Sequence, residues 1–351
     1  MRDRKKIIFI GPCGGGKSPS NGASYKNYYL LRHLEEKLGH LSIIDTEMWR
    51  KSPMLVIKLF FVILLNNDAR YIVSADSKSA YWLFCFFSFL PFSKRSIIYW
   101  AIGGAIANKI FEGKYAKWAY LKVDWFIVEG KKMKQTLALC GFYNVIVVPN
   151  FKKYDVALLE SLKLKSSSTH VRFVFLSRIL PEKGVDLILK ACEELSEKYE
   201  FSVVFYGPIE KTYKDVFMNR INSLCNVKYE GFLDLRQREN YKVLNDYDVM
   251  LFPTYWDGEG FPGVIVDSYI AGLPVIASDW SMNSEIIEDN VTGWIILSKN
   301  LDALIRQMRY VMESQSVLLK MGENCQIRAR QFCIDNVVND DLLKKLGLLD
   351  I

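Results

Sequence analysis

Short apolar runs alternate with helical segments along this sequence, and the pattern occurs twice within 351 residues. Glycines end some of the helical segments, as Gly39 and Gly141 do. Alternation of this kind predicts a parallel sheet with helices on both faces. Because the chain is longer than one hydrophobic core usually holds, we expect two such domains.

The expected elements divide into two sets. In the first half, strands are expected at 6–10, 41–44, 71–74, 96–100, 125–128 and 145–148, and helices at 25–38 and 131–140. In the second half, strands are expected at 172–176, 202–206, 227–229, 249–252, 274–277 and 293–296, and helices at 184–199, 216–224, 241–244, 263–271 and over 303–348. Two Rossmann-like domains in tandem would place the carboxyl ends of both parallel sheets around a cleft.

The polar, serine-rich stretch 164–170 predicts the linker. We therefore expect an acceptor-binding domain at 1–165, a second domain at 166–330, and a helical tail at 331–351 that packs back on the first domain. Half of the residues are hydrophobic and 24% are charged, which excludes disordered and collagen-like classes. Seven scattered cysteines and three histidines argue against a structural zinc site and for a cytoplasmic protein.

Charge is unevenly distributed between the two halves. Residues 1–165 carry 26 Lys and Arg against 12 Asp and Glu, whereas residues 166–351 carry 20 against 27. A basic half of this kind points to an anionic partner. It also holds two apolar-aromatic stretches, 53–65 and 81–92, which are too short to span a bilayer. These stretches are either core or a surface that docks on anionic lipid; both interpretations stay open.

Residues 11–18 fit the phosphate-binding pattern G-x-x-x-x-G-K-[ST] and follow a strand. Such a loop needs a helix that starts at Lys17, but Pro19 and Gly22 disfavour a helix there. We therefore interpret the segment as a long glycine-rich loop. A P-loop nucleotide-binding protein that uses Gly11 through Ser18 stays an alternative.

Three blocks of the second half carry the chemistry. They are FVFLSRILPEKGVDLILKA at 173–191, TYWDGEGFPGVIVDSYIAGLPVIASD at 254–279 and NSEIIEDNVTG at 283–293. Arg178 and Lys183 share one strand-to-helix loop, where two cations can meet the negative charge of a leaving diphosphate. A helix that begins near Gly263 offers its first amides to a phosphate.

In order and spacing, these blocks resemble the retaining, nucleotide-sugar-dependent glycosyltransferases of family 4 (glycosyl transferase group 1), which have the GT-B fold. The resemblance implies catalytic roles for Arg178, Lys183 and Glu259, with Glu259 at the hydroxyls of the transferred sugar. It implies that Asp267, where the family usually has glutamate, binds the ribose. The implied donor-binding set is Gly22, Gly207, Leu233, Gly260, Phe261, Pro262, Gly263, Val264 and Asp267.

The resemblance implies a metal-independent, retaining enzyme without a cofactor, which moves a hexose-type sugar from a UDP- or GDP-sugar to a glycan. With the basic first half, it predicts a polyprenyl-diphosphate-linked acceptor in capsule or O-antigen synthesis. The protein would lie at the cytoplasmic face of the cell membrane and bind no nucleic acid. A nucleotide-sugar epimerase of the same fold is the main alternative, and a non-catalytic member of a polysaccharide assembly complex is another.

Overall fold

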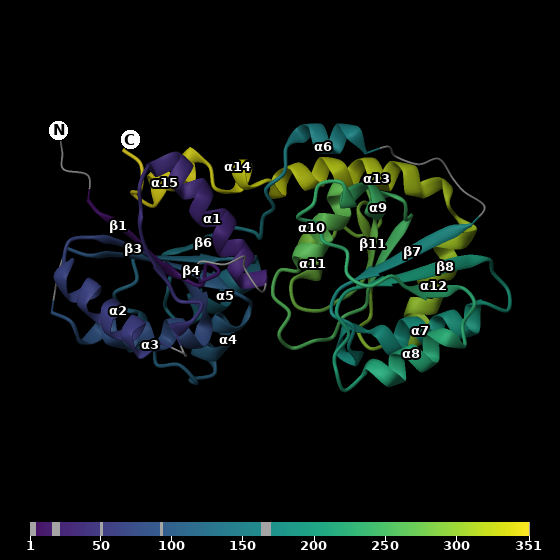
Figure 1. Cartoon of the computed structure of the whole chain (residues 1–351), viewed down its shortest axis with the longest axis horizontal. Coiled ribbons are helices and arrows are strands. Elements are labelled where there is room, and N and C mark those ends of the chain that lie inside the picture. Colours follow the sequence, from purple (N-terminus) through teal and green to yellow (C-terminus); the bar gives the residue numbers. More distant parts are fainter. Residues whose placement is uncertain (1–4, 16–21, 50–51, 92–93, 163–169, 351) are drawn as a thin grey trace. The chain divides into compact units, whose positions relative to one another are not determined.

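The computed structural model describes residues 5–15, 22–49, 52–91, 94–162 and 170–350. They form two compact units, one of Met1–Lys153 with Ile334–Ile351 and one of Tyr154–Cys333. The sequence predicts divisions at 165/166 and 330/331, and residues 164–169 of the expected linker 164–170 lie outside the described residues. Each unit holds a six-stranded parallel sheet with helices on both faces (Figure 1).

The first unit contains a sheet of order β2-β1-β3-β4-β5-β6. Its strands are β1 Ile7–Gly11, β2 Ser42–Asp45, β3 Arg70–Asp76, β4 Ser96–Ile102, β5 Trp125–Val128 and β6 Val145–Val147. Its helices are α1 Gly22–Leu38, α2 Pro53–Leu65, α3 Ser77–Phe89, α4 Ala105–Phe111, the 3-10 helix η2 Lys117–Tyr120, α5 Lys131–Leu139, α14 Ile334–Val337 and α15 Asp340–Lys345. The strand order changes direction between β1 and β3, which is where parallel sheets of this kind bind ligands.

Two helical layers cover this sheet. Helix α1 and the C-terminal segment lie on one face, where Leu30 and Leu34 pack with Leu343 over Phe9 and Ile72 (Figure 1). The buried His33 ring nitrogen Nε2 lies 2.8 Å from the Val338 carbonyl oxygen, a contact that holds the C-terminal segment on α1.

The opposite face is aromatic. The Phe84 ring of α3 packs edge-on against Tyr99 of β4 at 4.9 Å, and Phe87 packs against Tyr71 of β3 at 5.2 Å. Most of the 81–92 stretch therefore belongs to a helix whose inner side is core.

The second unit contains a sheet of order β12-β11-β10-β7-β8-β9. Its strands are β7 Val171–Leu176, β8 Phe201–Tyr206, β9 Val227–Tyr229, β10 Val249–Phe252, β11 Val275–Ser278 and β12 Gly293–Ile296. Its helices are α6 Val156–Ser161, η3 Pro181–Lys183, α7 Val185–Leu195, α8 Lys214–Asn222, α9 Asn240–Asn245, α10 Gly263–Ile270, α11 Asn283–Ile286, α12 Leu301–Glu313, α13 Ser316–Ala329 and η4 Arg330–Phe332. Here the order changes direction between β7 and β10.

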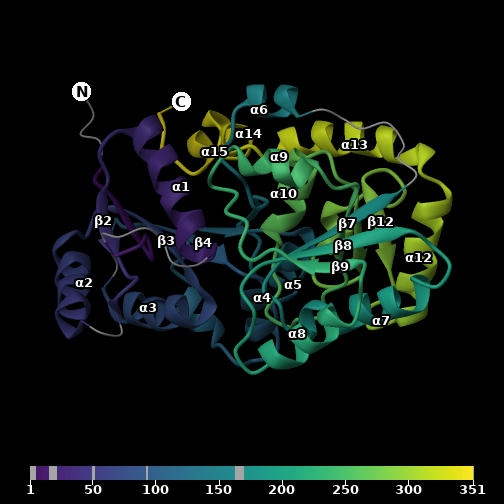
Figure 2. The same cartoon turned by 45° about the vertical axis from the view of Figure 1, so that its right-hand side comes forward.

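Helices α7, α8 and α12 lie on one face of this second sheet, and α9, α10 and α13 on the other (Figures 1 and 2). The first of these layers is a continuous apolar core in which Ile188, Phe217 and Met308 pack over Phe173 and Phe205. All twelve strands expected from the sequence form, and both sheets are parallel, so the predicted fold class is confirmed.

Candidate functional site

The candidate site is built where the second sheet changes direction, from the loops that follow β7 and β10. The β7 loop carries Arg178 and continues through η3 to Gly184, whose φ of +80° is in the left-handed region. A Cβ on Gly184 would lie 2.3 Å from the Pro253 carbonyl oxygen, so only glycine allows the two loops to approach this closely. The Tyr255 amide donates to the Glu182 carbonyl oxygen (2.8 Å) and joins the loops.

Two of the predicted catalytic residues meet between these loops. The Lys183 ammonium group forms an ion pair with Glu259 Oε2, and only 5% and 9% of the two side chains are exposed. Thr254 Oγ1 donates to the same carboxylate oxygen at 3.1 Å. Ser281 Oγ donates to the Glu259 carbonyl oxygen (2.9 Å), which fixes the backbone of this residue as well. The pair is therefore buried and oriented before any ligand arrives.

Trp256 brings the two predicted cations together. The Arg178 guanidinium carbon lies 4.6 Å from an indole ring centre, and Lys183 Nζ lies 4.5 Å from an indole ring centre. Cations at such distances are attracted by the negative ring face. The chain passes close to the indole at Gly258, where a Cβ would lie 2.5 Å from Trp256 Cζ2. The Trp280 Nε1 group donates to the Trp256 carbonyl oxygen (2.8 Å) and anchors this loop.

The environment of Lys183 changes its acidity. Burial lowers the pKa of the Lys183 ammonium group, and the charge of Arg178 acts in the same direction, while Glu259 raises it. Arg178, in contrast, is exposed. An incoming anion would therefore meet Arg178 first and would relieve the repulsion between the two cations.

The predicted donor-binding loop leads into α10. Gly260, Phe261 and Pro262 precede this helix, Pro262 is its N-cap, and Gly263 and Val264 form its first turn, with no side-chain cap on the first amides. The Phe261 ring is buried and lies 5.6 Å from the Phe332 ring, centre to centre. Its side chain thus anchors the loop in the core, which leaves the backbone to face a ligand.

Asp267 lies one turn into α10, as predicted, but its side chain is only 5% exposed. The Tyr241 hydroxyl of α9 donates to Asp267 Oδ1 at 2.6 Å. Its predicted role at a ribose stays a prediction, and that role has to be compatible with the Tyr241 contact.

The loops after β7, β8 and β9 interlock at the same edge of the sheet. Gly207 has a φ of +135°, and a Cβ there would lie 1.8 Å from the Ser177 carbonyl oxygen. The Gly207 amide donates to the Gly231 carbonyl oxygen (2.7 Å), which holds the loop containing the half-buried Leu233 beside it. Gly22 belongs to the first unit, where it is the exposed first residue of α1 and a Cβ would meet nothing within 4 Å.

The resemblance did not point to Trp256, Thr254, Ser281 or Tyr241 as site residues. Trp256 and Thr254 belong to the 254–279 block, so their position in sequence was visible. Their roles depend on ring stacking and hydroxyl contacts that only the folded loops create.

The P-loop interpretation meets a local obstacle in the first unit. The Cys13 and Gly15 amides donate to the two oxygens of Asp45, at 2.9 and 2.7 Å. These amides, which a phosphate-binding loop would direct at a phosphate, instead face a carboxylate that repels one. Residues 16–21, with Lys17 and Ser18, lie outside the described residues. Among the residues described, there is no group of three or more His, Cys, Asp or Glu side chains that could hold a metal ion.

Comparison with known proteins gives a consistent result. The sequence model of the family described as "Glycosyl transferases group 1" matches residues 160–331. The amylovoran biosynthesis glycosyltransferase AmsK of Erwinia amylovora is 31% identical over 44% of this chain and 37% of its own length. The O-antigen chain mannosyltransferase C of Escherichia coli is 22% identical over 48% of this chain and 44% of its own length. The chain thus matches less than half the length of these curated relatives.

Solved structures match over nearly the whole chain. Anabaena HepE in complex with UDP has a TM-score of 0.71 at 17% identity and covers 98% of this chain and 100% of its own. The lipopolysaccharide outer core galactosyltransferase WaaB, solved in its apo form, gives the same TM-score and coverage at 14% identity. These likenesses show that the fold is GT-B. The segment 160–331, which carries the paired cations and the glycine-rich loop, belongs to the glycosyl transferases group 1 family.

Proposed function

We propose that this protein is a retaining glycosyltransferase that moves a hexose-type sugar from a UDP- or GDP-sugar to a glycan acceptor without a metal ion. The observation that carries the proposal is the arrangement of Arg178 and Lys183 at Trp256, with Glu259 bonded to Lys183. Two fixed cations beside a helix N-terminus suit a diphosphate that gains charge as it leaves. The HepE structures in complex with UDP and with UDP-glucose support a UDP-sugar donor.

Each side chain has a role in this scheme. Arg178, which is exposed, and Lys183 would bind the diphosphate, and the first amides of α10 would bind it from the helix end. Glu259 would accept hydrogen bonds from the sugar hydroxyls while Thr254 and Ser281 hold it in place. The acceptor would attack on the face that the diphosphate leaves, and a donor phosphate oxygen would accept its proton.

For the acceptor we propose a polyprenyl-diphosphate-linked glycan at the inner face of the cell membrane. Relatives named for amylovoran, colanic acid and O-antigen synthesis support a role in surface polysaccharide assembly. The basic residues 1–165 and the apolar exposed side of α2 support contact with anionic lipid. No helix among the described residues is long and apolar enough to cross a membrane.

The test is thermal unfolding with excess UDP, GDP or ATP, with and without Mg²⁺. A ligand at 100 times its dissociation constant adds about 2.7 kcal/mol of stability, which is readily resolved. We expect UDP or GDP to stabilise the protein without metal, and Lys183→Ala to abolish this effect. Lys190→Ala, a change of an exposed lysine on α7, is the matched control.

Two results would contradict the proposal. Stabilisation by ATP that requires Mg²⁺ and is lost in Lys17→Ala would establish the P-loop alternative. Conversion of a UDP-sugar to its epimer in the absence of any acceptor would establish the epimerase.

A further inference from the structure

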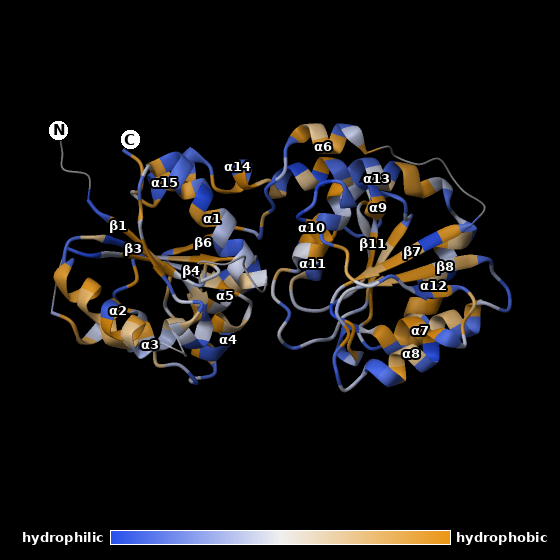
Figure 3. Cartoon of the chain, viewed as in Figure 1, coloured by the Kyte–Doolittle hydropathy of each residue, from blue (hydrophilic) through white to orange (hydrophobic). Residues whose placement is uncertain are grey.

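Helix α2 is apolar on nearly every side but lies at the surface. Its thirteen residues include one charged side chain, Lys58, and only Ile63 is buried. Met54 and Leu65 are 76% and 79% exposed, and Figure 3 shows most of the helix in the hydrophobic colour. A helix that is apolar all round is normally covered, so α2 has the composition of an element that contacts something apolar besides its own sheet.

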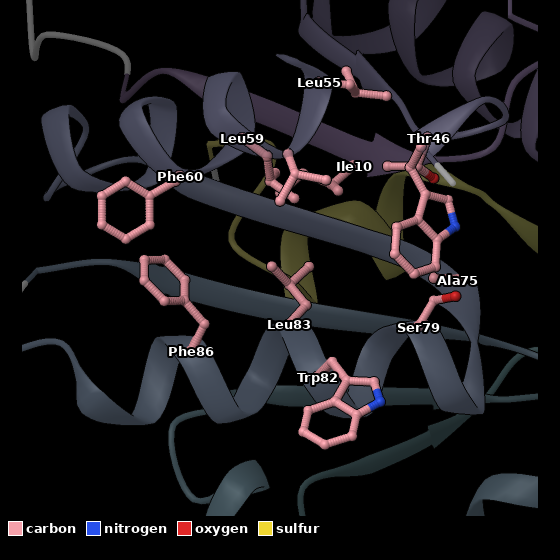
Figure 4. A pocket seen from close by; sticks show the side chains of 12 residues that line it. Ile10, Thr46, Leu55, Leu59, Phe60, Ala75, Ser79, Trp82, Leu83 and Phe86 are labelled. Atoms are coloured by element: carbon pink, nitrogen blue, oxygen red, sulfur yellow. The ribbon is translucent and has the colours of Figure 1, made fainter. Parts of the chain in front are cut away.

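A pocket lies between α2, α3 and the sheet (Figure 4), with a volume of about 300 Å³. Leu59 and Phe60 of α2 and Leu83 and Phe86 of α3 form its sides, and the Phe60 and Phe86 rings are 4.9 Å apart. None of its twelve lining residues is charged. A pocket of this size and lining suits a hydrocarbon ligand, because a polar ligand would lose its hydrogen bonds to water there.

The position of the pocket ties it to substrate binding. Ile10 and Ala75, the residues before the last of β1 and β3, line it, and so does Thr46, which directly follows β2. The pocket therefore opens at the carboxyl edge of the first sheet, between the two strands where its order changes direction. Ligands of open parallel sheets bind at this place, and the candidate donor site occupies the corresponding place in the second sheet.

The charge around the pocket favours an anionic head group on that hydrocarbon. Residues 46–122, which contain α2 and α3, carry 11 Lys and Arg against 4 Asp and Glu. Lys58 on α2 and Lys78 on α3 are exposed. The Asp76 carboxylate, at the N-terminus of α3, accepts hydrogen bonds from the Lys78 and Ser79 amides and from Ser79 Oγ. A hydrocarbon chain in the pocket would therefore lie in a segment of net positive charge, with the carboxylates of Asp45 and Glu47 on either side of the lining residue Thr46 in the sequence.

We propose that this pocket binds the hydrocarbon chain of the lipid-linked acceptor, an isoprenoid carrying a diphosphate, and so positions the acceptor at the edge of the first sheet. The inference rests on the proposed function for the identity of the lipid. An acyl chain of the bilayer would fit the same lining, but the place of the pocket at the sheet's ligand-binding edge favours the acceptor.

The test measures binding of farnesyl diphosphate to the full chain by calorimetry, with dodecyl phosphate and inorganic diphosphate as comparison ligands. Leu59→Trp fills the pocket from α2, and Leu83→Trp fills it from α3, in case the first variant folds poorly. Ile57→Trp adds the same side chain to the exposed side of α2, where Ile57 is 56% exposed. Stabilisation by UDP or GDP in each variant shows that the second unit is intact.

We expect farnesyl diphosphate to bind at least tenfold more tightly than either comparison ligand, and pocket-filling variants to lose at least tenfold in affinity while Ile57→Trp does not. Equal binding of inorganic diphosphate would show head-group binding alone, and equal binding of dodecyl phosphate would assign the pocket to bilayer lipid. Equal losses in Ile57→Trp and Leu59→Trp would show adsorption to the surface of α2. Each of these three results overturns the proposal, whereas failure of UDP and GDP to bind would instead overturn the proposed function.

Discussion

The strand order of both sheets changes direction at equivalent places, but the side chains at the two places are charged in one sheet and apolar in the other. Between β7 and β10, the loops present a buried ion pair and two cations on one indole ring. Between β1 and β3, the corresponding edge borders an apolar pocket without a charged lining residue. The same topology thus positions a ligand site in both units, and the side chains after each strand determine which ligand class each site can take.

A buried lysine–glutamate pair occurs in each unit and makes the contrast testable. In the first unit, Lys26 Nζ lies 2.5 Å from Glu129 Oε1, and the side chains are 6% and 5% exposed. We expect Lys26→Ala and Lys183→Ala each to lower the free energy of unfolding by about 3–5 kcal/mol, because each leaves a buried carboxylate unpaired. Only Lys183→Ala should also abolish stabilisation by UDP or GDP. Urea unfolding with and without nucleotide measures both effects.

The double variant Lys183→Met/Glu259→Gln is the control for this experiment, because it removes both charges. It should recover most of the stability lost in Lys183→Ala without recovering nucleotide binding. Loss of nucleotide binding in Lys26→Ala as well would mean that the second unit does not bind the nucleotide independently of the first.

Replacing Arg178 should affect catalysis with little effect on folding, because this residue is exposed. We expect Arg178→Ala to reduce turnover about 10²–10³-fold, the usual effect of losing one charge-stabilising donor. The free energy of unfolding should stay within about 0.5 kcal/mol of wild type. Steady-state kinetics with the donor identified by the unfolding screen measure the first effect. Unchanged turnover would remove Arg178 from the proposed diphosphate site.

The exposed side of α2 allows a test of the apolar region. Ile57 and Phe61 are 56% and 55% exposed, so the double change Ile57→Asp/Phe61→Asp should alter stability little. Because burial of each apolar side chain is worth about 1.5–3 kcal/mol, binding to vesicles of anionic lipid should fall more than tenfold. Sedimentation with vesicles measures this. Unchanged binding would show that α2 does not contact the bilayer.

The sequence predicted the strands better than the site. Strand–helix alternation is a local signal, and all twelve expected strands form. Most of these short β-rich runs are buried between helical layers, and the strands β2, β6 and β9, which lie at sheet edges, are partly buried. Arg178 and Lys183 could be predicted because one loop carries both. The part played by Trp256 could not, since nothing in its sequence position indicates that both cations lie close to its ring. The exposure of α2 could not be predicted either, because an apolar run looks the same whether it is core or surface.

The smallest expected effect concerns the C-terminal segment of the first unit. Lys37 Nζ of α1 lies 2.8 Å from Asp340 Oδ1 of α15, and this hydrogen bond and charge lower the pKa of the Asp340 carboxyl. A carboxyl whose pKa is lower in the folded protein stabilises the fold above its unfolded pKa, and this contribution disappears as the pH falls through the folded pKa. We therefore expect Asp340→Asn to be slightly less stable than wild type at neutral pH. Because the pair is exposed, the difference should be small, should shrink in high salt and should vanish in acid. Urea unfolding of both proteins from neutral to acid pH measures this difference in the free energy of unfolding. A difference that persists after the Asp340 carboxyl is protonated would mean that Asp340 holds α15 on α1 through its shape or its role at the start of the helix, and not through its charge.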